Sequence, residues 1–305
     1  MSHPRWPDLP YEAWKGTYEA LHLWSQIVGK VRLARMPWIN HCWQVTLYPT
    51  ARGLTTGPMP YDGEHLQIDF DFVAHELVVQ TSRGERRNLA LAPMSVADFY
   101  RALMAMLDAV RMPVAIYPKP SEMEEQVPFA ADTAVRPYDA DYARRCWRIL
   151  GSATDVFRRF RSRFGGKVSP VHFFWGSFDL AVTRFSGRTA PPHPGGVPNL
   201  PDRVTRDAYS HEVSSCGFWP GGAAAPYPLF YSYAYPEPAG FATAPLQPSA
   251  ARYDRLLREF VLPYALVSEA EAPEEMLLAF LQSSYEAAAN LGGWDRASLE
   301  ASPPP

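Results

Sequence analysis

The chain has 305 residues, a formal net charge of −3 and a hydrophobic fraction of 47%. This composition is typical of a folded globular protein and excludes an intrinsically disordered one. The charge excludes the broad positive field that nucleic-acid binding needs, and the densest basic run, 158–167, is interpreted as the solvated end of a helix. No apolar stretch approaches the ~20 residues that span a bilayer. We therefore expect neither nucleic acid nor membrane as a partner, and the oligomeric state stays open.

The cysteines and the first residues bear on the compartment. Only three cysteines occur, at positions 42, 146 and 216, and they are far apart in the sequence. An odd, scattered set argues against a disulfide framework and favours a reducing compartment. The opening stretch MSHPRWPDLPYEAW lacks the basic and apolar regions of a secretory signal. A cytoplasmic location is the simplest expectation.

The first half of the chain is predicted to be a helix, three strands and a helix. The opening helix repeats apolar residues at three- and four-residue steps and stops before Pro37. The closing helix starts at Ser95, which with Asp98 has the spacing of a capping box. The ranges are 11–35 and 95–110 for the helices and 42–53, 65–72 and 76–82 for the strands.

The second half repeats this order. Its last helix has Pro273 in the first turn and ends on Gly292 and Gly293, an arrangement typical of helix termini. The ranges are 141–164 and 272–293 for the helices and 172–185, 211–220 and 229–236 for the strands. A connection over 186–210 contains five prolines and three glycines, and unstructured connections of this length are often lids or pocket walls.

The repeated order predicts an α+β fold made of two pseudo-symmetric α-β-β-β-α halves, with mainly antiparallel sheet and helices packed on it. Trp43 and Arg52 have the same spacing as Trp175 and Arg184, which favours an internal duplication. The expected division is a first half over 1–116, a linker over 117–139, a second half over 140–300 and a tail over 301–305.

The two halves differ in the polarity of their strands. Because alternate residues of a strand face opposite sides, Leu66, Ile68 and Phe70 form a clean apolar face in the first half. The equivalent second-half positions are polar, and so are two more that align with Val45 and Leu47. These five polar positions are Ser177, Asp179, Glu212, Ser214 and Cys216.

Two interpretations follow from this difference. In the first, Asp179, Glu212 and Cys216 line one pocket walled by Trp175 and Trp219, a usual composition for a small-molecule site. In the second, the strands are flipped, so that Leu180 and Val182 are the buried residues of their strand. Asp179 is then solvated, and Arg184 lies with the apolar set. The tyrosines at 231, 233 and 235 form either a stacking wall for a ligand or an outer surface.

The polar residues permit several kinds of chemistry. Asp179 and Glu212 could act as an acid and a base, and Cys216 is either a nucleophile or an ordinary small hydrophobe. Two histidines, His172 and His211, could join one of the carboxylates in a divalent transition-metal site such as a non-haem iron centre. Arg184 could clamp an anion or pair with a carboxylate, while Ser177 and Ser214 could contact a substrate.

Several stretches carry a family resemblance. SPVHFFWGSFDLAVTRFSGR, NLGGWDR and WPDLPYEAWKGTYEALHLWSQIVGK resemble an uncharacterised bacterial family, domain of unknown function 5996. The similarity covers nearly the whole chain and implies one full-length module. It implies no activity, cofactor or partner.

The leading hypothesis from the sequence is an enzyme that acts on a small organic molecule through a carboxylate and histidine pocket in the second half, with the cofactor unknown and a metal possible. The alternative is a non-catalytic protein that binds a small ligand or serves as a scaffold, in which the polar strand residues form a structural network.

Overall fold

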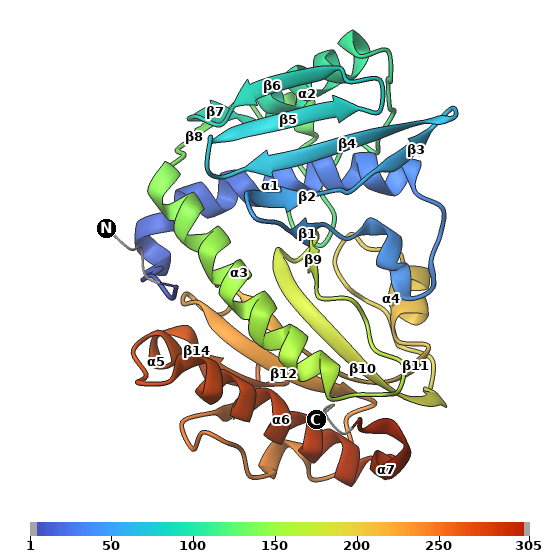
Figure 1. Ribbon diagram of the computed structural model, residues 1–305, viewed down its shortest axis with the longest axis vertical. Helices are drawn as coiled ribbons and strands as arrows, with labels where there is room; N and C mark the ends of the chain where they lie inside the picture. The colour runs from blue at the N-terminus through green and yellow to red at the C-terminus, as the bar shows by residue number, and fades with distance from the viewer. Residues whose placement is uncertain (1–4, 302–305) are drawn as a thin grey trace.

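The fold consists of two antiparallel sheets of six strands each, packed with helices (Figure 1). The computed structural model describes residues 5–301. Both sheets are open and antiparallel, so the predicted α+β class is confirmed. Within the described residues, no helix combines the length and apolar character that a membrane span requires.

Four long helices lie close to their predicted positions. Ser95 caps the second of them by accepting a hydrogen bond from the Asp98 backbone N–H, and Asp139 caps the third in the same way through Asp141 and Tyr142. The long helices are α1 (Tyr11–Arg35), α2 (Val96–Ala109), α3 (Ala140–Ser162) and α6 (Pro273–Leu291). The shorter ones are η1 (Asn40–Val45), η2 (Phe129–Ala131), α4 (Asp202–Ala208), η3 (Phe241–Thr243), α5 (Tyr264–Ser268) and α7 (Arg296–Leu299).

The first sheet has the order β1-β2-β4-β5-β6, with β3 paired to β4. Its strands are β1 (Tyr48–Pro49), β2 (Gly53–Thr55), β3 (Met59–Tyr61), β4 (Glu64–Asp71), β5 (Glu76–Thr81) and β6 (Arg86–Ala90). A separate pair, β7 (Met94–Ser95) and β8 (Val135–Arg136), joins the start of α2 to the linker.

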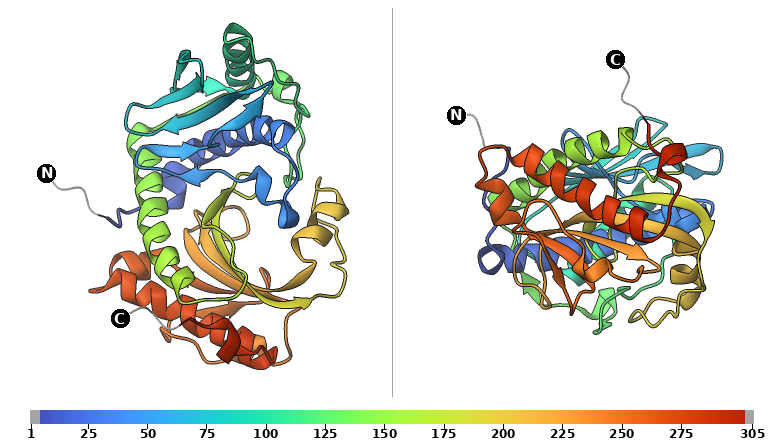
Figure 2. Two further views of the ribbon diagram at one scale, coloured as in Figure 1. Left: turned by 45° about the vertical axis from the view of Figure 1, so that its right-hand side comes forward. Right: turned by 90° about the horizontal axis from the view of Figure 1, so that it is seen from below.

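The second sheet has the order β13-β14-β12-β11-β10-β9. Its strands are β9 (His172–Phe174), β10 (Asp179–Thr189), β11 (His211–Trp219), β12 (Leu229–Tyr235), β13 (Arg252–Asp254) and β14 (Glu259–Pro263). The long connection over 186–210 is shortened by the end of β10 and by α4, which lies on the other side of the sheet from α3 and α6 (Figure 2).

Two predicted strands have a different structure. Trp43 lies in the 3-10 helix η1, and of the predicted strand 42–53 only Tyr48–Pro49 in β1 and Gly53 at the start of β2 belong to strands. The predicted strand 172–185 is a hairpin, because residues 175–178 turn the chain and Phe178 adopts a left-handed φ of 59°. Each half still contains a helix, an antiparallel meander and a helix. The internal duplication and the domain boundaries stay predictions.

Helix α1 is the central element of the molecule. Nearly every residue from Thr17 to Arg32 is buried, so the helix contacts protein on all sides. One continuous hydrophobic core contains residues of both halves. The two sheets also meet edge to edge, since Leu47 and Phe173 exchange backbone hydrogen bonds of 2.9 and 2.8 Å (Figure 1).

In the second sheet, the face that packs against helices is the one expected from the flipped interpretation and not from the pocket interpretation. Leu180, Val182 and Arg184 point to the face that α3 and α6 cover, in register with Phe218, Cys216 and Ser214. Asp179 points to the opposite face. However, it is only 7% exposed, so the expectation that a flipped Asp179 is solvated is wrong.

Gly29 allows the close contact between α1 and the second half. A Cβ atom at this position would lie 2.3 Å from the indole of Trp175, which is held in place by a 2.7 Å hydrogen bond to the Val45 carbonyl. We expect Gly29→Ala to lower the free energy of unfolding by about 1–3 kcal/mol despite the higher helix propensity of alanine. Chemical denaturation measures this change.

The matched control is Gly151→Ala in α3, where a Cβ atom would have no neighbour within 4 Å. The higher helix propensity of alanine alone then predicts that the free energy of unfolding rises by about 0.5–1 kcal/mol. If both variants gained stability, the close contact at Gly29 would not be a constraint.

Candidate functional site

A buried carboxylate, Asp179, lies at the first residue of β10. It accepts hydrogen bonds from the hydroxyls of Ser177 and Tyr231. The phenol of Tyr231 reaches Asp179 across the sheet because Gly217 lies between them, and a Cβ atom there would be 2.4 Å from the tyrosine hydroxyl. Burial raises the pKa of Asp179, and the two hydroxyl donors oppose that rise because they stabilise the charged form.

A polar stripe on α1 fixes the chain around Asp179. His22, Gln26 and Lys30 are spaced four residues apart, so they lie on one face of the helix, and all three are buried. His22 donates through Nε2 to the Gly176 carbonyl at 2.8 Å, and burial lowers its pKa to about 4, so the ring is neutral. The Gln26 amide donates to the Ser121 carbonyl at 2.8 Å and accepts from the Ser121 N–H at 2.9 Å.

Glu122 follows the clamped Ser121 and lies over the hairpin turn. Its carboxylate is so close to Gly176 that a Cβ atom there would be 1.9 Å from Oε1. Glu122 also has a left-handed φ of 60°, a conformation that costs energy in a residue other than glycine and that is concentrated at functional sites. Burial, followed by the charge of Asp179, raises the pKa of Glu122 to about 7.

A third carboxylate comes from another strand, β14, on the same face of the sheet as Asp179. Glu259 is the first residue of β14 and is partly exposed. Burial raises its pKa to about 8, and the charge of Asp179 adds to the rise. Nearby, the hydroxyls of Tyr209 and Tyr233 form a 2.8 Å hydrogen bond, and the ring of Tyr233 stacks on that of Tyr231 at 6.1 Å.

Lys30 is the one cation of this group. Its ammonium donates to the Ser121 hydroxyl at 2.7 Å and lies 5.4 Å from the ring centre of Trp175 and 5.3 Å from that of Tyr117. Burial lowers the pKa of Lys30 to about 8, although the charge of Glu122 opposes the shift. No ion pair of Lys30 occurs within residues 5–301.

We call this set the Asp179 cluster: Lys30, Glu122, Asp179, Tyr209, Tyr231, Tyr233 and Glu259. Two long connections meet beside it, since the Asn199 side chain donates to the Met123 carbonyl at 2.6 Å. The cluster therefore combines groups that exchange protons near neutral pH with tyrosine rings and hydroxyls. Such a set can protonate and deprotonate a small organic molecule or bind it without reaction.

Three predicted pocket residues lie elsewhere, which corrects the pocket interpretation. Ser214 and Cys216 point to the face that α3 and α6 cover, because their register partners in β10 are on that face. Glu212 precedes Ser214 by two residues in β11 and has the same parity. Glu212 pairs with Arg188 at 2.6 Å. The Cys216 thiol is buried, which raises its pKa to about 12, so it does not provide a thiolate.

Arg184 also lies on this covered face, as the flipped interpretation expects. It is 1% exposed, its guanidinium lies over the rings of Phe160 at 3.5 Å and Tyr285 at 4.3 Å, and it donates to the Phe160 carbonyl. Burial lowers its pKa to about 10. This position serves packing and is not that of an anion clamp.

The predicted metal ligands do not converge. His172 lies opposite Ala181 near the start of β10, and His211 lies opposite Thr189 at its end. At about 3.3 Å per residue the separation along the strand is on the order of 25 Å, too far for one ion. Among the described residues, no three or more His, Cys, Asp and Glu side chains are grouped to hold a metal.

Three predicted site residues remain, and their positions relative to the cluster differ: Ser177, Trp175 and Trp219. Ser177 is exposed and bonds Asp179, and Trp175 is buried beside Lys30. Trp219 is partly exposed at the end of β11, on the same face as Asp179. Tyr231 and Tyr233 also lie on this face, which fits the interpretation of the tyrosines as a wall.

Sequence reasoning missed Lys30, Glu122, Tyr209 and Glu259. One signal was present: His22, Gln26 and Lys30 place polar groups at four-residue steps within the largely apolar stretch 20–31 of the helix. Glu122 lies in the segment that was assigned as a linker, and Glu259 lies in a strand that was not predicted. Neither carries a pattern in the sequence that marks it.

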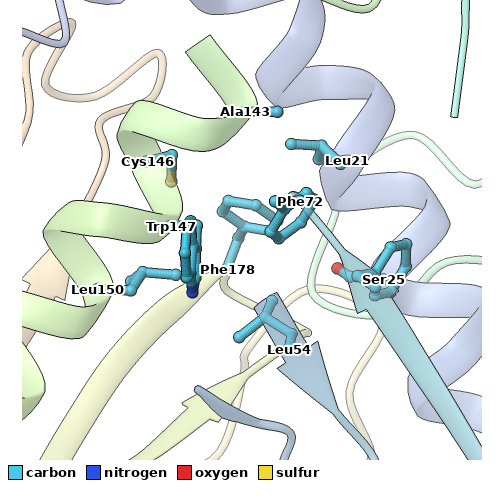
Figure 3. A pocket seen from close by; sticks show the side chains of 10 residues that line it. Leu21, Ser25, Leu54, Phe72, Ala143, Cys146, Trp147, Leu150 and Phe178 are labelled. Carbon is cyan, nitrogen blue, oxygen red and sulfur yellow. The ribbon is translucent and has the colours of Figure 1, made fainter. Parts of the chain in front are cut away.

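Two internal spaces lie apart from the cluster. The first is a void of about 10 Å³ between α1, α3 and the first sheet, lined by apolar side chains such as Leu21, Leu54 and Phe178 (Figure 3). It is too small and too apolar for an organic ligand. The second is a groove of about 630 Å³ along α3.

Comparisons with known proteins give a family and no activity. Residues 6–301 match the model of a family described as a family of unknown function (DUF5996). No curated protein and no solved structure matches the chain.

The raised pKa of Glu259 makes stability depend on pH. The folded protein keeps this proton up to about pH 8, whereas an unfolded chain releases it near the ordinary glutamate pKa of 4.5. The associated stability is therefore full below that value and is lost as pH rises through 8. We expect Glu259→Gln to reduce the loss of unfolding free energy between about pH 5 and 8 by about 1–3 kcal/mol.

Urea denaturation over this pH range provides the measurement. The control, Glu125→Gln, removes a carboxylate from an exposed residue near Glu122 and should leave the pH dependence unchanged. If the free energy of unfolding of Glu259→Gln depended on pH as that of the wild type does, the pKa of Glu259 would not be raised in the folded protein.

Proposed function

Since the chain belongs to this family of unknown function, we propose a role from the site alone: an enzyme that acts on a small organic molecule by proton transfer at the Asp179 cluster. One observation carries the proposal. Glu122, Glu259 and Lys30 have pKa values of about 7, 8 and 8 around a single buried carboxylate. Shifts of both carboxyl and amino groups toward neutrality in one place are typical of catalytic sites.

The two glutamates take different roles because their pKa values differ. At neutral pH, Glu259 is mostly protonated and serves as the acid, whereas Glu122 is partly ionised and serves as the base. Burial is the first cause of both raised pKa values, and the charge of Asp179 adds to it. Asp179 is therefore a positioning residue for the proton equilibrium, fixed in place by Ser177 and Tyr231.

The other members of the cluster bind and orient the substrate. Lys30 supplies a cation for a carbonyl or carboxylate oxygen, and the phenols of Tyr209 and Tyr233 supply hydroxyl groups. The partial exposure of Glu122, Tyr209, Tyr233 and Glu259 gives a ligand access to these groups. We place the protein in the cytoplasm, in keeping with three cysteines that are all free.

The test is incubation of the purified protein with a small-molecule extract, followed by mass spectrometry. We expect at least one compound to be consumed, with a rate that rises through pH 7 as Glu122 ionises and falls through pH 8 as Glu259 does. In Asp179→Asn the rate should fall by roughly 100-fold or more. Asp69→Asn, a change on the first sheet, should keep the rate.

The same experiment distinguishes the enzyme from the alternative, a non-catalytic protein that binds a small ligand. If compounds bind to the wild-type protein but not to Asp179→Asn, and none is converted at any pH, the site is a non-catalytic one for a small ligand. Equal turnover by wild type and Asp179→Asn would place the activity elsewhere and refute the proposal.

A further inference from the structure

A groove of about 630 Å³ runs along the outer face of α3. Its lining also includes residues 49–51, at the end of β1 and in the turn after it, and Arg5. The groove lies beside the helix that covers one face of the second sheet, whereas the Asp179 cluster lies on the other face. It is therefore separate from the proposed catalytic site.

Arg148 is the exceptional side chain in this groove. Its Nε atom is buried and has no hydrogen-bond partner among residues 5–301, and its guanidinium forms no ion pair with them. Leaving a buried charged donor without an acceptor costs free energy. The absence is notable because neighbouring arginines of α3 do have acceptors. These are Arg144 (Phe72 and Val73 carbonyls), Arg145 (Asp141), Arg159 (Glu275) and Arg161 (Ser169 carbonyl).

The charges of the groove favour an anion. Three arginines line it, Arg5, Arg148 and Arg158, against a single carboxylate, Asp155. That carboxylate is shared, since Arg5 approaches it at 3.0 Å and Arg158 at 3.9 Å. Arg5 also pairs with Glu274 at 3.5 Å, so Arg148 is the one arginine of the groove without any partner among residues 5–301.

Two residues of the groove, Gly151 and Trp147, provide open space and an aromatic surface for an organic ligand. Gly151 lies one turn after Arg148, and a Cβ atom there would meet nothing within 4 Å, so the helix surface is open at this point. A glycine in a helix interior costs about 1 kcal/mol relative to alanine, and no close packing contact accounts for it here. Trp147 lines the same groove, with its indole N–H fixed by a 3.0 Å hydrogen bond to the Thr50 carbonyl.

We propose that this groove binds a small organic anion, with its carboxylate or phosphate group on the Arg148 guanidinium and a flat apolar part beside Trp147. A guanidinium binds both kinds of anion through paired N–H donors, which is why the two share one chemistry. The volume suits a ligand of the size of a metabolite.

Isothermal titration calorimetry with phenyl phosphate, benzoate and inorganic phosphate tests the proposal. We expect saturable binding of phenyl phosphate or benzoate that is tighter than that of inorganic phosphate, because only the aromatic probes contact Trp147. The better of the two aromatic probes identifies the anionic group. Arg148→Met should weaken its binding by roughly tenfold or more.

A second variant keeps all the charges. Gly151→Leu should block the groove and reduce binding to a similar degree, while thermal unfolding confirms that each variant is folded. The control is Arg163→Met, which removes an exposed arginine at the end of α3, outside the groove, and should bind as the wild type does.

Three results would overturn the proposal as a whole, and a fourth would contradict one part of it. The three are no saturable binding of any probe at millimolar concentration, equal affinity in wild type and Arg148→Met, and unchanged binding in Gly151→Leu. Inorganic phosphate binding as tightly as phenyl phosphate would also contradict the role of Trp147.

Discussion

The arrangement of the second half around α1 depends on three buried polar side chains, His22, Gln26 and Lys30. Polar groups inside a protein are tolerated only when they are hydrogen-bonded, and each of these finds its partner in the hairpin turn or the segment after the first half. Moving either segment would leave buried donors unpaired. The stripe therefore fixes Gly176 and Ser121, and through them it sets Glu122 above Asp179.

The two faces of the second sheet differ: one packs against helices, and the other carries the Asp179 cluster. The side toward α3 and α6 is closed by aromatic and aliphatic residues and even accommodates Arg184 by stacking it between rings. The other side carries carboxylates, tyrosines and the ends of two long connections. Because little solvent reaches these carboxyl groups and Asp179 adds its charge, protons are held on Glu122 and Glu259 at a pH where exposed glutamates have lost them.

The sequence predicted what depends on local patterns and missed what depends on tertiary contacts. Apolar periodicity and the Ser95 cap located the long helices, and alternation located β4, β5, β11 and β12. Asp179 was singled out because a carboxylate in an apolar strand needs an explanation. The grouping of Asp179 with Glu212 and Cys216 is wrong, since the register between β10 and β11 pairs Val182 with Cys216 and so places Asp179 on the opposite face, and this register cannot be read from residue counting within one strand. Glu122 and Glu259 become neighbours of Asp179 only through the Gln26 clamp and the β12–β14 pairing.

Burial and the charge of Asp179 together hold protons on Glu122 and Glu259 near neutral pH, and a carboxyl-carbon NMR titration measures this most directly. The account predicts midpoints of about 7 for Glu122 and about 8 for Glu259 in the wild-type protein, and lower values for both in Asp179→Asn. Midpoints near the ordinary glutamate value in the wild type, or values unchanged in Asp179→Asn, would contradict it.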